Sequence, residues 1–225
     1  MTSFVLIPGA GGTAWYWHRV VPMLQAAGYE AIAVDLPGPD EKAGLDVYAE
    51  IVVKALENQK DVILIAQSLG AFTAPLVCER VPVRMLILAN PMIPLPGETA
   101  GEWWGNTKSH EAQAAAAKRG GYSGEFDQFT YFLHDVPPDI IKDGASHQRS
   151  EADIIFKQPC LFTAWPPLPL LHVITGSGDR FFPPEFQARI ARERLGKDID
   201  IVRGGHLNAL SYPQDFVERV LSYLS

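Results

Sequence analysis

Short apolar runs alternate with longer amphipathic segments along most of the chain. The runs are rich in Val, Ile, Leu and Ala and lack a polar face, which is typical of strands covered by helices on both sides. The alternation itself is typical of a sheet whose strands run parallel. We expect strands at 4–7, 31–34, 62–66, 85–89, 172–175 and 199–202.

Helices are predicted between these strands. Val47, Ile51 and Ala55 form a stripe at helical spacing within residues 45–58. Residues 184–195 follow two prolines and stop at Gly196, and helices commonly start and end with these residues. Further helices are expected at 15–27, 69–80, 111–119 and around 216–224.

The order of these elements predicts the fold class. Each strand–helix–strand unit needs a right-handed crossover, so the six runs predict a six-stranded, mainly parallel, doubly wound α/β sheet. The stretch between the fourth and fifth strands is much longer than a crossover requires. We interpret residues of about 92–168 as a helical cap insertion in a single domain spanning 1–225.

The predicted insertion is rich in aromatic side chains. One interpretation is that they form a small core of the insertion's own. The other is that they make a lid over a pocket. The residues are Trp103, Trp104, Phe126, Phe129, Tyr131, Phe132, Phe162 and Trp165.

Composition narrows the class of protein. Apolar residues make up 47% and charged residues 20% of the 225, which is typical of a globular protein, and the net charge of −7 disfavours nucleic acid as a partner. The two cysteines, Cys78 and Cys160, suit a reducing compartment. Without a basic leader or a long apolar run, we expect a cytoplasmic location and no membrane partner.

The segment Ala66-Gln67-Ser68-Leu69-Gly70 lies between a predicted strand and a predicted helix. A nucleophile elbow occupies this position in a sheet, because the tight strand-to-helix turn presents a serine hydroxyl at the carboxyl end of the strand. Such a turn needs small residues two positions before and after the serine. The motif alone is weakly specific, but its context predicts that Ser68 is a nucleophile.

Two other polar residues follow predicted strands. Asp179 comes after the fifth strand and His206 after the sixth, so both are expected on the same rim as Ser68. Imidazole can take the serine proton, and a carboxylate on its other nitrogen can hold its tautomer. The order serine, aspartate, histidine is also that of α/β-hydrolases. We therefore predict a catalytic triad of Ser68, His206 and Asp179.

Backbone amides are expected to bind the oxyanion that forms when a serine attacks a carbonyl carbon. One candidate is the amide of Leu69, directly after the predicted nucleophile. The other is the amide of Ala10, in the glycine-rich loop of residues 9–12. No pair of His or Cys residues shows metal-ligand spacing, so we expect neither a metal nor a cofactor.

The same loop supports an alternative. Residues 9–14 match a dinucleotide-binding fingerprint, and Asp35 follows at the expected distance. This interpretation predicts a NAD(P)-dependent reductase. Pro8 and the aromatic run 15–17 disfavour it, and it leaves the predicted triad without a role.

With these residues identified, the chain resembles the α/β-hydrolase superfamily. It is most similar to the plant methylesterases and hydroxynitrile lyases and their bacterial relatives. Lyase members carry a Thr in the oxyanion loop and a Lys after the catalytic His, where this chain has Ala10 and Leu207. The resemblance rests on segments 4–10, 12–17, 31–36, 66–70, 184–187 and 205–211.

The resemblance and the predicted triad together imply a serine hydrolase that cleaves a small carboxylic ester through an acyl-enzyme. A carbon–carbon lyase using the same triad is the main alternative, and a ligand receptor that keeps the fold is another. The ester is the partner we expect. Whether two copies form a homodimer is left open by the sequence.

Overall fold

A six-stranded sheet forms the centre of the computed structural model, which describes residues 2–166 and 170–224. The strand order is β2-β1-β3-β4-β5-β6, and each neighbouring pair is parallel, which confirms the predicted fold class. The predicted end of the insertion near 168 lies outside the described residues, as do Met1 and Ser225. The strands are β1 (Ser3–Ile7), β2 (Glu30–Ala33), β3 (Val62–Gln67), β4 (Met85–Ala89), β5 (Leu170–Gly176) and β6 (Asp200–Val202).

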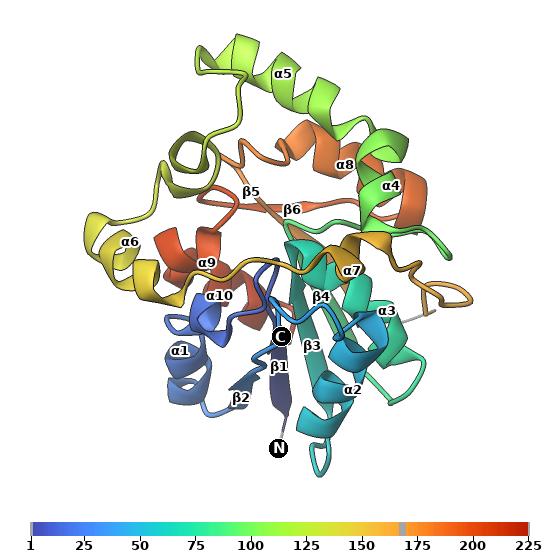
Figure 1. Ribbon diagram of the computed structural model, residues 1–225. Helices are drawn as coiled ribbons and strands as arrows, with labels where there is room; N and C mark the ends of the chain where they lie inside the picture. Colours follow the sequence, from blue (N-terminus) through green and yellow to red (C-terminus); the bar gives the residue numbers. More distant parts are fainter. Residues whose placement is uncertain (1, 167–169, 225) are drawn as a thin grey trace.

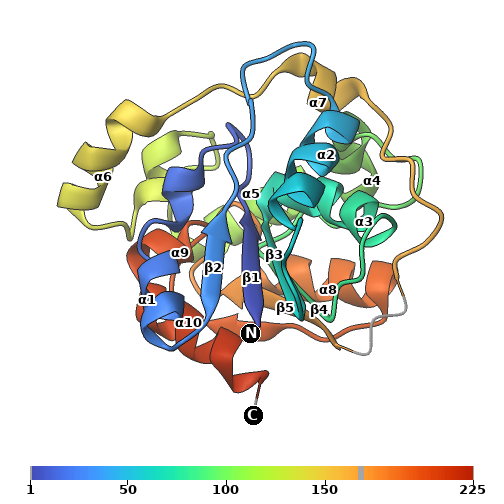
Figure 2. The same cartoon turned by 90° about the horizontal axis from the view of Figure 1, so that it is seen from below.

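Helices cover both faces of the sheet (Figure 2). Because side chains alternate along a strand, Val5 and Ile7 pack into one core cluster and Phe4 and Leu6 into the other. The first cluster lies under α2 (Leu45–Ala55), α3 (Thr73–Cys78) and α8 (Pro184–Leu195). The second lies under α1 (Val21–Ala26), α9 (Asn208–Ser211) and α10 (Pro213–Ser222).

Two predicted helices are each divided into a 3₁₀ turn and a short α-helix. The helix expected at 15–27 is the turn η1 (Ala14–Trp17) followed by α1, where Pro22 lies in the first turn. The helix expected at 69–80 is the turn η2 (Ser68–Phe72) followed by α3. A proline has no amide hydrogen to continue a helix, so each α-helix begins just before one.

The chain between β4 and β5, residues 90–166 of the described part, is named the cap segment. Figure 1 shows its helices above the end of the sheet to which the strands run. Its regular elements are helices, as expected of the insertion, joined by long loops and one isolated β-bridge between Thr99 and Pro159. Its elements are α4 (Ala100–Thr107), α5 (Ser109–Gly120), the π-helical turn η3 (Phe129–Leu133), α6 (Pro138–Gly144), η4 (Ala145–His147) and α7 (Asp153–Lys157).

The aromatic residues of the cap segment do not all share one core. Trp103 and Phe162 are buried in the same cluster as one face of the sheet, so for them the interpretation of a core of the insertion's own is wrong. Trp104 and Phe132 instead line a cavity over the strand ends, as the lid interpretation predicts. Trp103 joins the core of the sheet because α4 packs directly against the loop before α8, where the ring of Phe182 lies 5.1 Å from that of Trp103.

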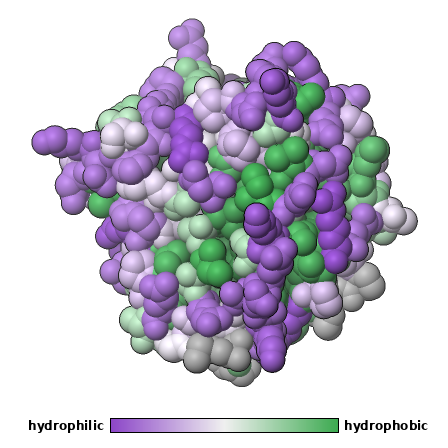
Figure 3. All heavy atoms as spheres, turned by 60° about the horizontal axis from the view of Figure 1, so that its bottom comes forward, coloured by the Kyte–Doolittle hydropathy of each residue, from purple (hydrophilic) through white to green (hydrophobic). Residues whose placement is uncertain are grey.

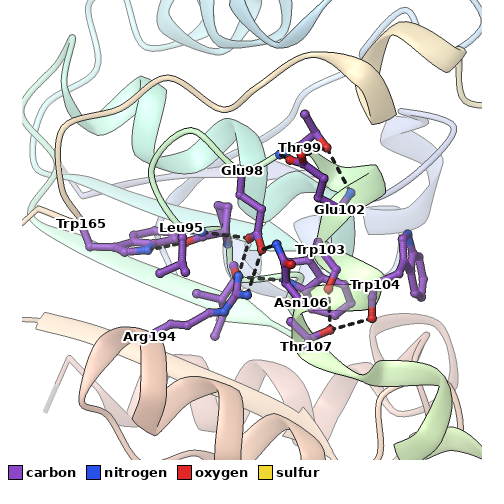
Figure 4. Close-up of polar contacts among 12 residues, drawn as sticks. Leu95, Glu98, Thr99, Glu102, Trp103, Trp104, Asn106, Thr107, Trp165 and Arg194 are labelled. Atoms are coloured by element: carbon purple, nitrogen blue, oxygen red, sulfur yellow. Dashed lines mark hydrogen bonds and ion pairs between the residues drawn. The ribbon is translucent and has the colours of Figure 1, made fainter.

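A buried ion pair joins the cap segment to α8 (Figure 4). Arg194 donates from Nη1 and Nη2 to the two carboxylate oxygens of Glu98, the second bond measuring 3.0 Å. The same carboxylate accepts hydrogen bonds from the Leu95 amide and from Nδ2 of Asn106. The side chains of Glu98 and Arg194 are 4% and 6% exposed, so water does little to compensate either charge.

We expect Glu98→Gln to lower the free energy of unfolding by about 3–5 kcal/mol, because it leaves the Arg194 guanidinium buried without a counter-charge. Urea unfolding followed by circular dichroism measures the change. Asp198→Asn, which breaks an exposed pair with Arg192, is the matched control and should leave the urea midpoint nearly unchanged. Equal midpoints for both variants would contradict a stabilising role for the buried pair.

Most of the surface is polar, with local apolar patches. Figure 3 shows one face on which hydrophobic side chains gather towards the middle and hydrophilic ones surround them. Phe126 and Phe129 of the cap segment are 60% and 63% exposed. Of the helices in the described part of the chain, none is long and apolar enough to cross a membrane.

Candidate active site

Ser68 lies at the tight turn between β3 and η2, as the elbow motif predicts. Its φ is +49°, in the left-handed region that non-glycine residues seldom adopt. The turn also needs a glycine two residues later, because a Cβ at Gly70 would lie 2.5 Å from the carbonyl oxygen of Pro8. Ser68 is thus held in a strained turn whose neighbours leave no room for larger residues.

The structure brings Ser68, His206 and Asp179 together in series. Nε2 of His206 lies 3.0 Å from the Ser68 hydroxyl oxygen, and Nδ1 lies 2.9 Å from Oδ2 of Asp179. The other carboxylate oxygen, Oδ1, accepts hydrogen bonds from the amides of Phe181 and Phe182. All three predicted side chains are buried, at 7%, 2% and 3% exposure.

This arrangement has the geometry of an activated nucleophile. With the Asp179 carboxylate accepting from Nδ1–H of His206, Nε2 is left as the acceptor for the serine proton. The rings of Phe132, Phe181 and Phe182 lie 5.1–5.2 Å from the imidazole and exclude water around it. The site can therefore support attack of the serine oxygen on an electrophilic carbon.

Three residues that sequence analysis missed hold the loop that carries His206. Asn90, fully buried directly after β4, donates from Nδ2 to the carbonyl oxygen of His206 over 2.9 Å. Nε2 of Gln67 donates to the same oxygen over 3.4 Å. Oδ2 of Asp135, in the cap segment, accepts from the Gly205 amide over 2.6 Å.

A usable sequence signal existed for Asn90 and Gln67. Each is a polar residue at the end of a buried strand, the same kind of position that identified the predicted triad. Along the sequence, Asp135 lies within the cap segment and far from the end of any strand. Nothing in the local pattern distinguishes it from a surface carboxylate.

The loop of residues 9–12, named the glycine loop, lies against the elbow. A Cβ at Gly9 would overlap Oε1 of Gln67 and lie 3.1 Å from Cβ of Ser68, so a larger residue here would displace the Gln67 side chain. The amides of Gly11 and Gly12 bond to Glu151 and to the Gly9 carbonyl oxygen. Among the described residues no group accepts a hydrogen bond from the amides of Ala10 and Leu69, the two predicted oxyanion donors.

A cavity of about 410 Å³ opens above Ser68, within the range of small-molecule sites. Among the described residues that line it, Arg149 is the one Lys or Arg, and it makes a bidentate ion pair with Asp35. The cavity is therefore mainly apolar and offers little uncompensated charge. Its apolar walls come from both the sheet side and the cap segment: Tyr16, Met92, Trp104, Phe132, Leu133, Val136, Ile140, Phe156, Phe181 and Leu207.

The groups that a dinucleotide would need are engaged by the protein itself. The Gly11 amide donates to Glu151 over 2.6 Å, where the fingerprint would present it to a pyrophosphate. Asp35, the acidic residue of the predicted fingerprint, is paired with Arg149 and accepts from the Ala14 amide. Its pKa is lowered: burial acts to raise it, but the hydrogen bonds from Arg149 and Ala14 outweigh that effect. The geometry thus disfavours the reductase alternative.

The remaining titratable side chains do not gather into a metal site. Within residues 2–166 and 170–224, no group of three or more His, Cys, Asp or Glu side chains could hold a metal ion. Burial raises the pKa of the Cys78 and Cys160 thiols to about 12. Both cysteines are therefore protonated near neutral pH and make poor ligands and nucleophiles.

Sequence comparison finds relatives among hydrolases. A family model described as the alpha/beta hydrolase family matches residues 4–219. The methyl jasmonate esterase 1 of Vitis vinifera is 32% identical over 104 residues, covering 42% of this chain and 40% of that protein. A probable esterase of Oryza sativa is 34% identical over 89 residues, covering 35% and 34%. The matched stretches thus span only a third to two fifths of these relatives' length.

Solved structures share the whole fold. Polyneuridine aldehyde esterase superposes with a TM-score of 0.79 at 18% identity and covers 100% of both chains. A pyrethroid hydrolase from Sphingobium faniae gives a TM-score of 0.75 at 18% identity, covering 99% of this chain and 97% of that one. At this identity the likeness concerns the fold. Together with the family match it confirms the resemblance that the sequence motifs indicated.

Proposed function

Because the chain belongs to the α/β-hydrolase family, we propose that it cleaves a small carboxylic ester, with Ser68, His206 and Asp179 as a catalytic triad. The observation that carries the proposal is the unbroken hydrogen-bond series from Asp179 through His206 to the Ser68 hydroxyl. The series ends at the floor of an apolar cavity of ligand size.

In the first half of the reaction the Ser68 oxygen attacks the ester carbonyl carbon while Nε2 of His206 takes its proton. The carbonyl oxygen becomes an oxyanion, which the amides of Ala10 and Leu69 stabilise. The tetrahedral intermediate then breaks its bond to the alkoxy oxygen. His206 returns the proton to that oxygen, so an alcohol leaves and an acyl group stays on Ser68.

Water completes the cycle. His206 removes a proton from a water molecule as its oxygen attacks the acyl carbon. The second tetrahedral intermediate expels the Ser68 oxygen, which takes the proton back from the imidazolium. The carboxylic acid is released and the triad is restored. Throughout, the Asp179 carboxylate stabilises the charged imidazolium without itself gaining a proton.

The lining of the cavity favours a neutral ester with apolar substituents. The Arg149 side chain in the described part of its lining is paired with Asp35, and most of its walls are aromatic or aliphatic. The names of the relatives, a methyl jasmonate esterase and a probable esterase, also support an ester substrate. Beside His206, Leu207 presents an apolar side chain where the lyases carry Lys, which favours hydrolysis.

The proposal is tested with p-nitrophenyl acetate and butyrate, the anionic p-nitrophenyl hemisuccinate, and a fluorophosphonate probe. We expect turnover of the two neutral esters, much slower turnover of the anionic ester, and a probe adduct on Ser68 identified by mass spectrometry. A protein that neither reacts with the probe nor hydrolyses any ester would contradict the proposal. Cyanide release from mandelonitrile without ester turnover would favour the lyase instead.

A further inference from the structure

A carboxylate of the cap segment accepts a hydrogen bond from the glycine loop. Glu151, two residues before α7, accepts a hydrogen bond from the Gly11 amide at Oε2 over 2.6 Å. Its other oxygen, Oε1, accepts from the hydroxyl of Tyr48 on α2 over 2.5 Å. One side chain therefore joins the cap segment, the helix layer of the sheet and the loop that carries Ala10.

The glycine loop needs such an external contact to keep one shape. It is a run of three glycines and one alanine, and Gly11 and Gly12 have φ values of +84° and +66°. Glycines reach many backbone conformations, so the loop's own residues do little to select this one. The Gly11 amide follows Ala10 directly. Holding it fixes the peptide unit next to the one that carries the proposed oxyanion donor, the Ala10 amide, and so restricts the backbone of Ala10 between them.

The chain around Glu151 is fixed without the help of its carboxylate. On one side Arg149 makes a bidentate ion pair with Asp35. On the other, the Ala152 amide donates to the Gly38 carbonyl oxygen over 2.7 Å. The Glu151 side chain is thus a contact added to a segment already in place. Replacing it should affect the glycine loop more than the docking of the cap segment.

A carboxylate that only filled space would be unfavourable at position 151, because the site is largely buried. Burial raises the pKa of the Glu151 carboxyl group, although the hydrogen bonds from Tyr48 and Gly11 act in the opposite direction. A methionine of similar size would fill the same space without any desolvation penalty. What the carboxylate provides, and an apolar side chain cannot, is an acceptor for the Gly11 amide.

We infer that Glu151 is a positioning residue for the oxyanion hole, holding the Gly11 amide so that the neighbouring Ala10 amide faces the Ser68 hydroxyl. The inference rests on the proposed ester hydrolysis. Tyr48 supports the same contact by fixing the orientation of the carboxylate. Because an oxyanion exists only after attack on the carbonyl carbon, the contribution belongs to the transition state and not to substrate binding.

Two substitutions of Glu151 by side chains of similar size test whether the acceptor for the Gly11 amide matters. Glu151→Met removes it, and we expect kcat for p-nitrophenyl acetate to fall about 10- to 100-fold, less than the loss of a whole oxyanion donor, while KM changes less than about threefold. Glu151→Gln keeps an acceptor for the Gly11 amide and should retain kcat within about threefold of wild type, since geometry is preserved. Affinity for a boronic acid transition-state analogue should fall in parallel with kcat.

Glu41→Ala is the matched control. The Glu41 carboxylate accepts from the amides of Asp153 and Ile154, so its loss loosens the start of α7 without touching the glycine loop. Its kcat should stay near that of wild type. If Glu151→Met fails to fold by circular dichroism, Tyr48→Phe takes its place and should lower kcat at unchanged KM.

Equal kcat values for the folded Met and Gln variants, or a loss confined to KM, would overturn the inference. Failure of the proposed function looks different, because it appears in the wild-type protein as absent turnover and absent probe labelling. In that case the amide resonance of Gly11 still decides whether Glu151 holds the loop. It should shift upfield in Glu151→Met and stay near its wild-type position in Glu151→Gln.

Discussion

Ser68→Ala is expected to lower kcat/KM for p-nitrophenyl acetate by about 10⁴- to 10⁶-fold, as removal of a triad serine does elsewhere. The alanine keeps the turn after β3 but has no oxygen to form the proposed acyl-enzyme. Folding should persist, because among the described residues the Ser68 hydroxyl makes one side-chain hydrogen bond, to His206. Steady-state hydrolysis together with fluorophosphonate labelling measures the effect.

Ser177→Ala is the matched control for this substitution. Ser177 lies on the same rim, directly after β5, but its side chain is exposed and its amide bonds to the Val202 carbonyl oxygen. We expect wild-type turnover and labelling from this variant. Retention of more than about 1% of wild-type activity in Ser68→Ala would show that another group acts as nucleophile.

Asp179→Asn should lower kcat by about 10⁴-fold with little change in overall structure. The amide oxygen can still accept from the amides of Phe181 and Phe182, which turns its NH₂ group towards Nδ1 of His206. Nδ1 must then act as acceptor, so the proton moves to Nε2. An imidazole protonated at Nε2 cannot take the proton of Ser68. Stopped-flow hydrolysis of p-nitrophenyl acetate measures the rate.

Asp135→Asn provides the comparison for Asp179→Asn. It changes a second carboxylate near His206 in the same way, but its oxygen can go on accepting the Gly205 amide. We expect its kcat to remain within about tenfold of wild type, since the imidazole tautomer is unaffected. A similar loss in both variants would mean that local charge, and not the tautomer, governs the rate.

Hydrophobic pattern carries most of the information about this fold. The run at 85–89 coincides with β4, and the other five strands differ from prediction only at their ends. The helix at 184–195 coincides with α8 because a proline start and a glycine stop mark it. Segments 15–27 and 69–80 were less predictable, since apolar spacing does not distinguish an α-helix from a 3₁₀ turn followed by one.

In the candidate site, too, some residues could be predicted from the sequence and others could not. Ser68, Asp179 and His206 could be placed on one rim because each follows a parallel strand, and parallel strands end at the same edge. The supporting contacts could not be placed this way. Asp135 and Glu151 reach the site from a segment whose path is set by tertiary packing, as with Trp103 against Phe182. No local periodicity encodes such a path.

The hydrogen bonds that the Asp135 and Glu151 carboxylates accept from backbone amides also matter for protein engineering. Exchanging caps between homologues is an attractive way to graft new selectivity onto an existing catalyst. In this chain a chimaera that replaced residues 90–166 wholesale would also discard the acceptors for Gly205 and Gly11. Donor sequences should therefore be screened for a carboxylate at both places, so that the recombinant retains its reactivity along with its redesigned cavity.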